Sequence, residues 1–452
     1  MKIKLIQPKM SKRPMDTSLK ARMSPPLALY TIASILRAEH EVIIENENIE
    51  SINFEEGVDL VGISVTVDVF PRAIEIAKAF KTMGITVIVG GIHISSDPEG
   101  CSQVFDSICI GPSENLWSYI LEDLNKGQLK KRYQDDGSFN SDSFVSPAYD
   151  LMKKDRYLFS NIIYTSYGCP FRCDFCYNSV ATYRNIYVHK SVDMVIGEIK
   201  AIGRKHIMIV DDNFIGDPAW TLEFLDKVRP LRIKWNAAVS ANIVDMPVLL
   251  DSMADSGCQG LFIGFESLSQ AVVSEVNKGQ NVISKYEKLV DEVHKRGMMV
   301  NASFVFGLDG DDQGVFRRTV DWLVKNRIET VTSHILTPYP GTCLYDRWKK
   351  ERRIISDDLS LYSTAKVVIV PADMSSRELY EGYMWVYREL YSFKNIIRRI
   401  PLSRKQIIPF FMFNFFYRKF GWLTEGVARV VNFERVGRFA EWVSRYMVSK
   451  ES

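Results

Sequence analysis

The sequence contains no run of 18 uninterrupted apolar residues and therefore predicts no membrane-spanning helix. Charge of one sign is not in excess either. The 57 Lys and Arg residues stand against 55 Asp and Glu, a balance that predicts no nucleic-acid partner. The seven cysteines are an odd number, and Met1-Lys2-Ile3-Lys4 is not the start of a secretory signal. We therefore expect a cytoplasmic protein that has no disulfide framework and whose thiols bind metal.

The 452 residues have an ordinary globular composition, 46% hydrophobic and 25% charged, and suffice for two or three domains. In the N-terminal part, short β-branched runs alternate with segments of helical periodicity. Strands are predicted at 2–6, 41–44, 60–65 and 86–91, and helices at 26–39 and 71–83. This alternation is typical of βαβ units and predicts a parallel sheet.

Small residues follow three strands of this sheet. The segments are Ser64-Val65-Thr66, Gly90-Gly91-Ile92-His93 and Gly111-Pro112-Ser113-Glu114. Ligands of parallel sheets bind at the carboxyl ends of the strands, and small residues let a large ligand approach the backbone. No G-x-G-x-x-G follows any of these strands, which argues against a standard dinucleotide site.

A second βα series follows a polar stretch at about 130–146, which we interpret as an inter-domain connection. Its strands are predicted at 162–165, 206–210, 234–238, 260–264, 299–306 and 330–336. Its helices are predicted at 192–202, 220–228, 246–256, 284–296 and 314–325. About six such units are too few for a closed eight-stranded barrel, so an open partial barrel is predicted.

Three of the seven cysteines lie directly after the first strand of this series. Cys169, Cys173 and Cys176 are spaced C-x3-C-x2-C, and one compact loop of that kind can hold an iron–sulfur cluster. Three ligands to a four-iron cluster leave one iron open to a ligand that is not protein. The alternatives are a zinc knuckle completed by a histidine such as His189, and thiols that are close by chance.

The cysteine motif with its aromatic residue Phe175, the N-terminal α/β domain, the Gly90–His93 edge and the segment Thr337–Thr342 resemble one class of the radical S-adenosylmethionine (radical SAM) superfamily. That class carries a cobalamin-binding domain before the radical SAM barrel. The resemblance implies an α/β protein in four parts. They are a Rossmann-like doubly wound cobalamin-binding domain at 1–135, a linker at 136–157, a partial (β/α)6 barrel at 158–350 and a C-terminal helical domain at 351–452.

The resemblance also implies roles for individual residues. Cys169, Cys173 and Cys176 would ligate a [4Fe–4S] cluster whose open iron binds SAM. Further cofactor contacts are implied for Phe175 at the adenine, Asp211 or Asp212 at the methionine amine, Glu266 at the ribose, and Gly307 at the adenine through its backbone. Cobalamin would lie against Ser64, Gly90, Gly91, His93 and Glu114, and Tyr339 would line the substrate pocket.

Several of these residues have a plainer interpretation. Asp211 and Asp212 are also suited to cap the following helix, and Glu266 to be a solvated loop carboxylate. Tyr339 is equally suited to be a packed loop aromatic. For cobalamin, residues 1–135 lack the D-x-H-x-x-G segment that supplies a histidine to cobalt in other cobalamin proteins, and Gly111–Glu114 replaces the usual G-E-G-E.

The resemblance predicts a radical SAM enzyme that cleaves SAM to a 5′-deoxyadenosyl radical and uses cobalamin to methylate an apolar or lipid-like small molecule. The electron donor would be a flavodoxin or a ferredoxin. One alternative is radical SAM rearrangement, ring formation or oxidation with a vestigial cobalamin domain. Another is an iron–sulfur or zinc binding module without turnover.

The C-terminal part differs in composition from the rest. From Tyr391 to Ser452 there are 12 Lys and Arg against 4 Asp and Glu, and 14 aromatic residues, many of them between Phe410 and Phe420. Such a mixture predicts either peripheral contact with a membrane surface or an apolar substrate, or a helical layer whose aromatics form core.

Overall fold

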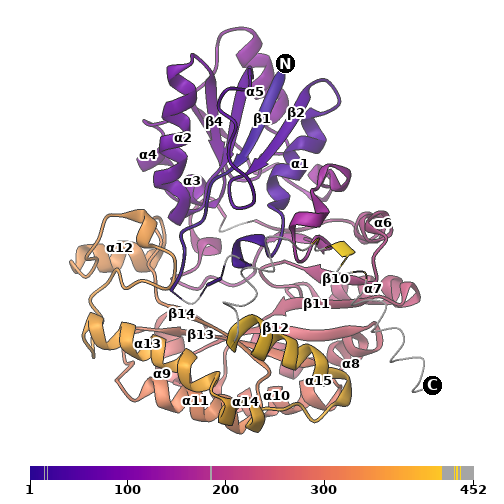
Figure 1. Cartoon of the computed structure of the whole chain (residues 1–452), viewed down its shortest axis with the longest axis vertical. Helices are drawn as coiled ribbons and strands as arrows, with labels where there is room; N and C mark the ends of the chain where they lie inside the picture. Colours follow the sequence, from indigo (N-terminus) through magenta and orange to yellow (C-terminus); the bar gives the residue numbers. More distant parts are fainter. Residues whose placement is uncertain are drawn as a thin grey trace.

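The computed structural model describes residues 1–419 except 15, 18, 184 and 185, and beyond them only residues 432, 434, 435 and 438. Two parallel six-stranded sheets lie one above the other (Figure 1). The first strand runs from the N-terminus toward the second sheet, so the carboxyl edge of the first sheet faces the second domain (Figure 1). The predicted α/β fold class is confirmed.

The first sheet has the strand order β2-β1-β3-β4-β5-β6, and every pair is parallel. Its strands are β1 (Lys2–Gln7), β2 (Glu41–Asn46), β3 (Leu60–Ser64), β4 (Thr86–Gly90), β5 (Ser107–Ile110) and β6 (Arg132–Gln134). One face packs on α1 (Leu27–Leu36) and α5 (Trp117–Asn125), and the other on α2 (Phe70–Thr82), α3 (Ile92–Ser96) and α4 (Pro98–Cys101). Because helices cover both faces, the strands are nearly continuous apolar runs.

The edge strand β6 was not predicted, because its sequence lies in the polar stretch interpreted as a connection. Its central Tyr133 is 5% exposed, while Arg132 and Gln134 point to solvent. Arg132 also forms an ion pair with Glu99. One buried residue between two exposed ones is too short a pattern to identify a strand from sequence.

The second sheet has the order β14-β13-β12-β11-β10-β7 and is open, as the partial barrel predicted. Its strands are β7 (Ile162–Ile163), β10 (His206–Ile209), β11 (Lys234–Val239), β12 (Cys258–Glu266), β13 (Met299–Phe306) and β14 (Thr330–Ile335). The helices of this domain are α6 (Val192–Ile202), α7 (Pro218–Val228), α8 (Pro247–Asp255), α9 (Gln270–Glu275), α10 (Tyr286–Lys295) and α11 (Val315–Lys325). An antiparallel hairpin of β8 (Ser166–Gly168) and β9 (Tyr187–His189) follows β7.

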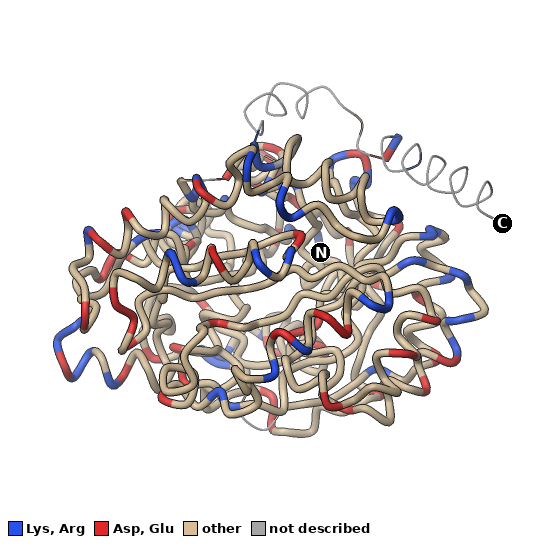
Figure 2. The backbone as a smooth tube through the Cα atoms, turned by 90° about the horizontal axis from the view of Figure 1, so that it is seen from below, with Lys and Arg blue, Asp and Glu red and all other residues tan. Residues whose placement is uncertain are grey.

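The C-terminal helices are α12 (Cys343–Lys350), α13 (Ser376–Leu390), α14 (Phe393–Arg398) and α15 (Arg404–Phe411), followed by a π-helix at Met412–Lys419. Phe410 and Arg399 are fully buried there, so part of the aromatic run is core. In the part of the chain that the structure describes, no helix is long and apolar enough to cross a bilayer. Positive and negative residues are interspersed along most helices (Figure 2).

Candidate active site

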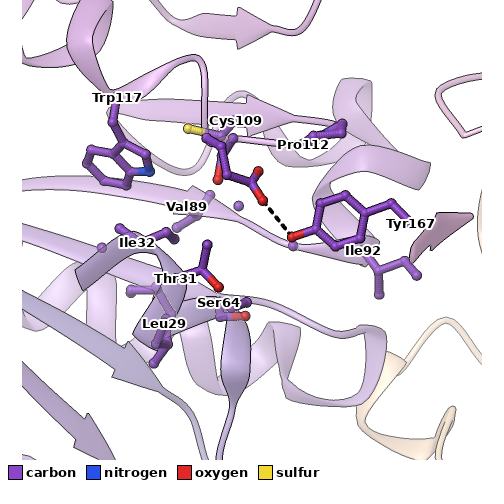
Figure 3. Close-up of a pocket in the computed structure, with 18 of the residues that line it drawn as sticks. Leu29, Thr31, Ile32, Ser64, Val89, Ile92, Cys109, Pro112, Trp117 and Tyr167 are labelled. Atoms are coloured by element: carbon purple, nitrogen blue, oxygen red, sulfur yellow. Dashed lines mark hydrogen bonds between the residues drawn. The ribbon is translucent and has the colours of Figure 1, made fainter. Parts of the chain in front are cut away.

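A cavity of about 250 Å³ lies at the carboxyl edge of the first sheet and continues between that sheet and helices α1 and α5. The edge contributes Ser64, Gly90, Gly91 and Glu114, four of the five residues predicted to contact cobalamin. The second domain contributes Tyr167, Gly168, Asn178, Tyr183 and Asp212. Figure 3 shows the side chains that converge on this space. The cavity is therefore shared by both domains.

Two features of the lining fit a large ligand with polar groups. Gly62 lies in the middle of β3, where a Cβ atom would be 2.8 Å from Cδ2 of Leu5 and 3.8 Å from the Trp117 ring. Gly91 has φ 111°, and a Cβ there would be 2.7 Å from the carbonyl oxygen of Val65. The ring of Trp117 lines the cavity, and its buried indole Nε1 has no hydrogen-bond partner in the described structure.

Glu114 receives a hydrogen bond from the other domain. The phenol of Tyr167 donates to Glu114 Oε1 at 2.7 Å, marked by the dashed line in Figure 3. Burial raises the pKa of Glu114, although the Tyr167 hydrogen bond opposes that rise. Tyr167 was not among the predicted site residues. The indication that the sequence offers is its position two residues before Cys169.

His93, the fifth residue predicted to contact cobalamin, does not line the cavity. Its ring is 1% exposed and packs edge-on against Phe70, with 4.7 Å between the ring centroids. Burial lowers the pKa of His93 to about 4. α3 begins directly after Gly91 and turns His93 toward α2, so the contact with cobalamin stays a prediction that the position of the ring does not favour.

The three clustered cysteines lie in the loop after β8, and all three are free thiols. The loop is held by the segment that follows α9. Asp174 N donates to Val276 O at 3.0 Å, and Asn277 Nδ2 donates to Arg172 O at 2.8 Å. Gln280 Nε2 lies 3.6 Å from Cys173 Sγ. Two regions far apart in sequence thus fix the shape of the cysteine loop.

This arrangement does not favour the zinc alternative. Among the described residues, no three His, Cys, Asp or Glu side chains are placed to hold a single metal ion. The ring of His189 stacks on Trp220 at 4.6 Å instead of approaching the thiols. The three free thiols remain the predicted ligands of the cluster.

Burial raises the pKa of Cys169 to about 11 and that of Cys176 to about 12. The pKa of Cys173 is also raised by burial, although the charge of Lys278 opposes this. Because thiolates are the ligands, a cluster would displace these protons.

A buried ion pair supports the same loop. Lys278 Nζ lies 2.5 Å from Glu266 Oε1, and the two side chains are 12% and 8% exposed. The ammonium also lies 5.8 Å from the ring centroid of Phe175. The interpretation of Glu266 as a solvated loop carboxylate was therefore wrong. Lys278 was missed, since nothing in its local sequence indicates burial.

The adjacent Asp211 and Asp212 have different surroundings. Asp211 is 5% exposed and accepts hydrogen bonds from Thr165 N at 2.6 Å and from Thr165 Oγ1. Asp212 instead faces the cavity, where its charge acts on Cys169 and Cys176. Neither caps the next helix, because Asp217 accepts from the backbone at the start of α7. Burial raises the pKa of both, that of Asp211 to about 6.

The two remaining predicted residues lie farther along the barrel. Gly307 has φ 94°, and its N–H donates to Asp311 Oδ2 at 3.0 Å, which leaves only its carbonyl for a ligand. Tyr339 stacks on Tyr177, with 4.4 Å between the ring centroids, directly after the cysteine loop. Tyr339 is thus both a packed aromatic and a neighbour of Cys176.

Comparisons with known proteins agree with this geometry. The model of the Radical SAM superfamily matches residues 163–323, and the model of the B12 binding domain matches residues 21–118. The bacteriochlorophyllide d C-12(1)-methyltransferase of Chlorobaculum tepidum is 28% identical over 92% of this chain and 93% of its own length. The hopanoid C-2 methylase of Rhodopseudomonas palustris is 25% identical over 75% of this chain and 67% of its own.

Solved structures share the fold. OxsB, a cobalamin-dependent radical enzyme with aqua-cobalamin and SAM bound, superposes with a TM-score of 0.70 at 16% identity, covering 95% of this chain and 71% of its own. TsrM of Kitasatospora setae, with cobalamin and a [4Fe-4S] cluster bound, superposes with a TM-score of 0.62 at 17% identity. The match covers 77% of this chain and 75% of TsrM.

The chain contains a radical SAM domain, preceded by a B12-binding domain. It is an enzyme, similar over most of its length to two bacteriochlorophyllide d methyltransferases. The class predicted from the sequence is confirmed at the level of these two domains, and the cofactors predicted for it are those bound in OxsB and TsrM.

Proposed function

We propose that this protein uses a [4Fe–4S] cluster, SAM and cobalamin to methylate a carbon of an apolar small molecule. The observation that carries the proposal is the shared cavity. Its lining joins the glycine-rich edge of the first sheet to Asp212, whose charge acts on two of the clustered thiols. When bound, the cluster and SAM supply radical chemistry and cobalamin supplies methyl transfer.

Each cofactor has its own group of residues. Cys169, Cys173 and Cys176 hold the cluster, and the Glu266–Lys278 pair keeps their loop in place. The residues that would hold cobalamin are those of the cavity lining, among them Trp117 and Glu114.

Asp212 is the carboxylate suited to bind the SAM amine, because Asp211 already accepts hydrogen bonds from Thr165. Asp212→Asn should weaken SAM binding about tenfold, the effect of one charge-assisted hydrogen bond. Asp211→Asn should instead lower the stability of the barrel. Isothermal titration with SAM and chemical unfolding of both variants check this assignment.

For the substrate, the carboxyl ends of the barrel strands offer aromatic and apolar surface. Val210, directly after β10, is 43% exposed, and the stacked pair Tyr177–Tyr339 lies beside Cys176.

The described C-terminal helices support peripheral membrane contact by a cytoplasmic protein. Phe393, Ile397, Leu402, Ile408 and Met412 are between 47% and 78% exposed, and Lys394, Arg398, Arg404 and Lys405 lie among them. Basic residues near an anionic bilayer contribute about 1 kcal/mol each. Co-sedimentation with anionic vesicles should occur at low salt and disappear at high salt. Protein that stays in the supernatant at low salt would contradict the contact.

The direct test of the proposed reaction uses anaerobically reconstituted protein loaded with hydroxocobalamin and supplied with reduced flavodoxin. It should contain about four irons per chain and an equimolar amount of cobalt, and it should convert SAM to both 5′-deoxyadenosine and S-adenosylhomocysteine. Iron without cobalt, with 5′-deoxyadenosine as the only product, would favour rearrangement, ring formation or oxidation. Neither product would indicate a binding module.

A further inference from the structure

The hydrogen bond between Tyr167 and Glu114 joins the two domains inside the cavity. Tyr167 belongs to β8 and precedes the cluster ligand Cys169 by two residues, while Glu114 follows β5 of the first sheet. Both residues line the cavity. A contact there can couple the cobalamin cavity to the cysteine loop.

The ring of Tyr167 is fixed before any ligand arrives. It stacks on Tyr164 with 5.2 Å between the ring centroids and 3° between the ring planes. Its ring centroid also lies 5.4 Å from that of Phe139 and 5.1 Å from that of Phe144. Both phenylalanines belong to the segment between the two domains. A side chain held this way loses little further conformational entropy when its hydroxyl forms a hydrogen bond.

A buried ion pair, Lys190–Glu198, packs against this aromatic cluster. The ammonium of Lys190 lies 3.7 Å from the ring centroid of Tyr164 and 2.7 Å from Glu198 Oε1. Lys190 and Glu198 side chains are 0% and 2% exposed. Glu198 also accepts hydrogen bonds from Ser146 Oγ at 2.8 Å and Tyr149 OH at 3.3 Å. A satisfied buried network of this kind makes the position of Tyr164, and hence of Tyr167, well defined.

On the other side of the cavity, Glu114 ends the turn Gly111–Glu114, whose residues all line the cavity. The N–H of Gly111 is held by Ser95 Oγ at 2.9 Å, so the start of the turn is fixed within its own domain. The end of the turn is fixed by Tyr167 from the other domain. The turn therefore depends on both domains for its shape.

We propose that Tyr167 is a positioning residue for cobalamin, which acts by holding Glu114 and the 111–114 turn against the cofactor. The inference rests on the proposed function and deepens it, because it makes the segment that carries the cluster ligands one wall of the cobalamin site. Loss of the phenol hydroxyl leaves the packed ring in place and releases the turn, and it also removes a longer hydrogen bond of 3.5 Å to the Tyr164 hydroxyl.

Tyr167→Phe is the direct test, with hydroxocobalamin as the probe. Because the variant leaves the buried carboxyl group of Glu114 without this hydrogen bond, it should bind about tenfold more weakly, mainly through faster dissociation. Tyr133→Phe is the matched control. Tyr133 also donates to a carboxylate, Asp123 Oδ2, at 2.8 Å in the first domain, but it does not line the cavity. Its affinity for hydroxocobalamin should equal that of the wild type.

A double-mutant cycle separates positioning from a general structural effect. Glu114→Ala, which removes the acceptor, should weaken binding, and Tyr167→Phe added to Glu114→Ala should weaken it no further, because Tyr167 acts through Glu114. Iron content after reconstitution shows that the barrel is folded in each variant. Wild-type affinity in Tyr167→Phe, or effects that multiply in the double variant, would overturn the inference alone. A wild-type protein that binds no cobalamin would overturn the proposed function itself.

Discussion

The two sheets present their carboxyl edges to one another, yet the edges are chemically different. At the first edge, Gly90, Gly91 and Gly111 expose backbone, and the cavity behind them is mostly apolar. At the second edge, three thiols lie beside the buried pair Glu266–Lys278. A large cofactor such as cobalamin requires space, whereas an iron–sulfur cluster and SAM require specific side chains. The two edges should therefore respond to different substitutions.

The largest effect is expected at the second edge. Replacing Cys169, Cys173 and Cys176 by Ala should abolish iron binding, because the cluster has no other protein ligands. Binding of hydroxocobalamin at the first edge should persist. Iron analysis and cobalamin titration of the same sample provide the two readings. The control Cys101→Ala/Cys343→Ala, which changes two isolated thiols, should keep a full cluster; iron retained in the triple variant would contradict the assignment.

The second prediction concerns the paired charges beside the cluster loop. Lys278→Met leaves Glu266 buried without its partner and should lower the free energy of unfolding by about 3–5 kcal/mol. The double variant Glu266→Gln/Lys278→Met removes both charges and should recover part of that loss. Denaturant unfolding of the protein without cofactors measures both values. Equal stability of the single variant and the wild type would mean that the pair is not buried in solution.

At the first edge, a substitution should act by filling space and not by removing a charge. Gly62→Val places a side chain where Leu5 and Trp117 already lie. The overpacking should lower the free energy of unfolding by about 1–3 kcal/mol. It should also weaken cobalamin binding, because Leu5 and Trp117 line the cavity and must shift to make room. Gly57→Val is the control, since nothing lies within 4 Å of a Cβ there. Iron binding should be unchanged in both. A Gly62→Val protein with wild-type cobalamin affinity would show that the cofactor lies elsewhere.

A smaller expected effect is the pH dependence of stability that arises from His93 in the first domain. His93 is buried and its pKa is lowered to about 4, below the ordinary value of 6.5. Between these values the unfolded chain binds more protons than the folded one, so stability falls as the pH drops. From pH 7 to 5 the loss is about 2 kcal/mol. Unfolding of wild type and His93→Gln at both pH values should show the steeper decrease in the wild type; parallel decreases would contradict the lowered pKa.

The fold was largely predictable because its strands are continuous buried runs. Periodicity located all six barrel strands and helix α6 at Val192–Ile202, and the edge segments after β3, β4 and β5 followed from the same pattern. Short or irregular elements such as β6 could not be found this way. A three-residue strand has too few positions for periodicity to distinguish it from a loop.

The site was predictable only where a motif is local. Cys169, Cys173 and Cys176 are close in sequence, so their spacing alone indicated the cluster. Lys278 and Tyr167 depend on contacts with residues distant in sequence, and no local pattern reports such contacts. Even the adjacent residues Asp211 and Asp212 differ, because only Asp211 meets the backbone of Thr165.

The central claim is that two separate edges hold cobalamin and SAM within one shared site. The most direct measurement compares the products formed from SAM by wild-type and Gly62→Val protein, each reconstituted with a full cluster. The wild type should form 5′-deoxyadenosine and S-adenosylhomocysteine. Gly62→Val should keep the first product and lose most of the second, because only methyl transfer requires the cobalamin edge. Undiminished S-adenosylhomocysteine in Gly62→Val would contradict the account.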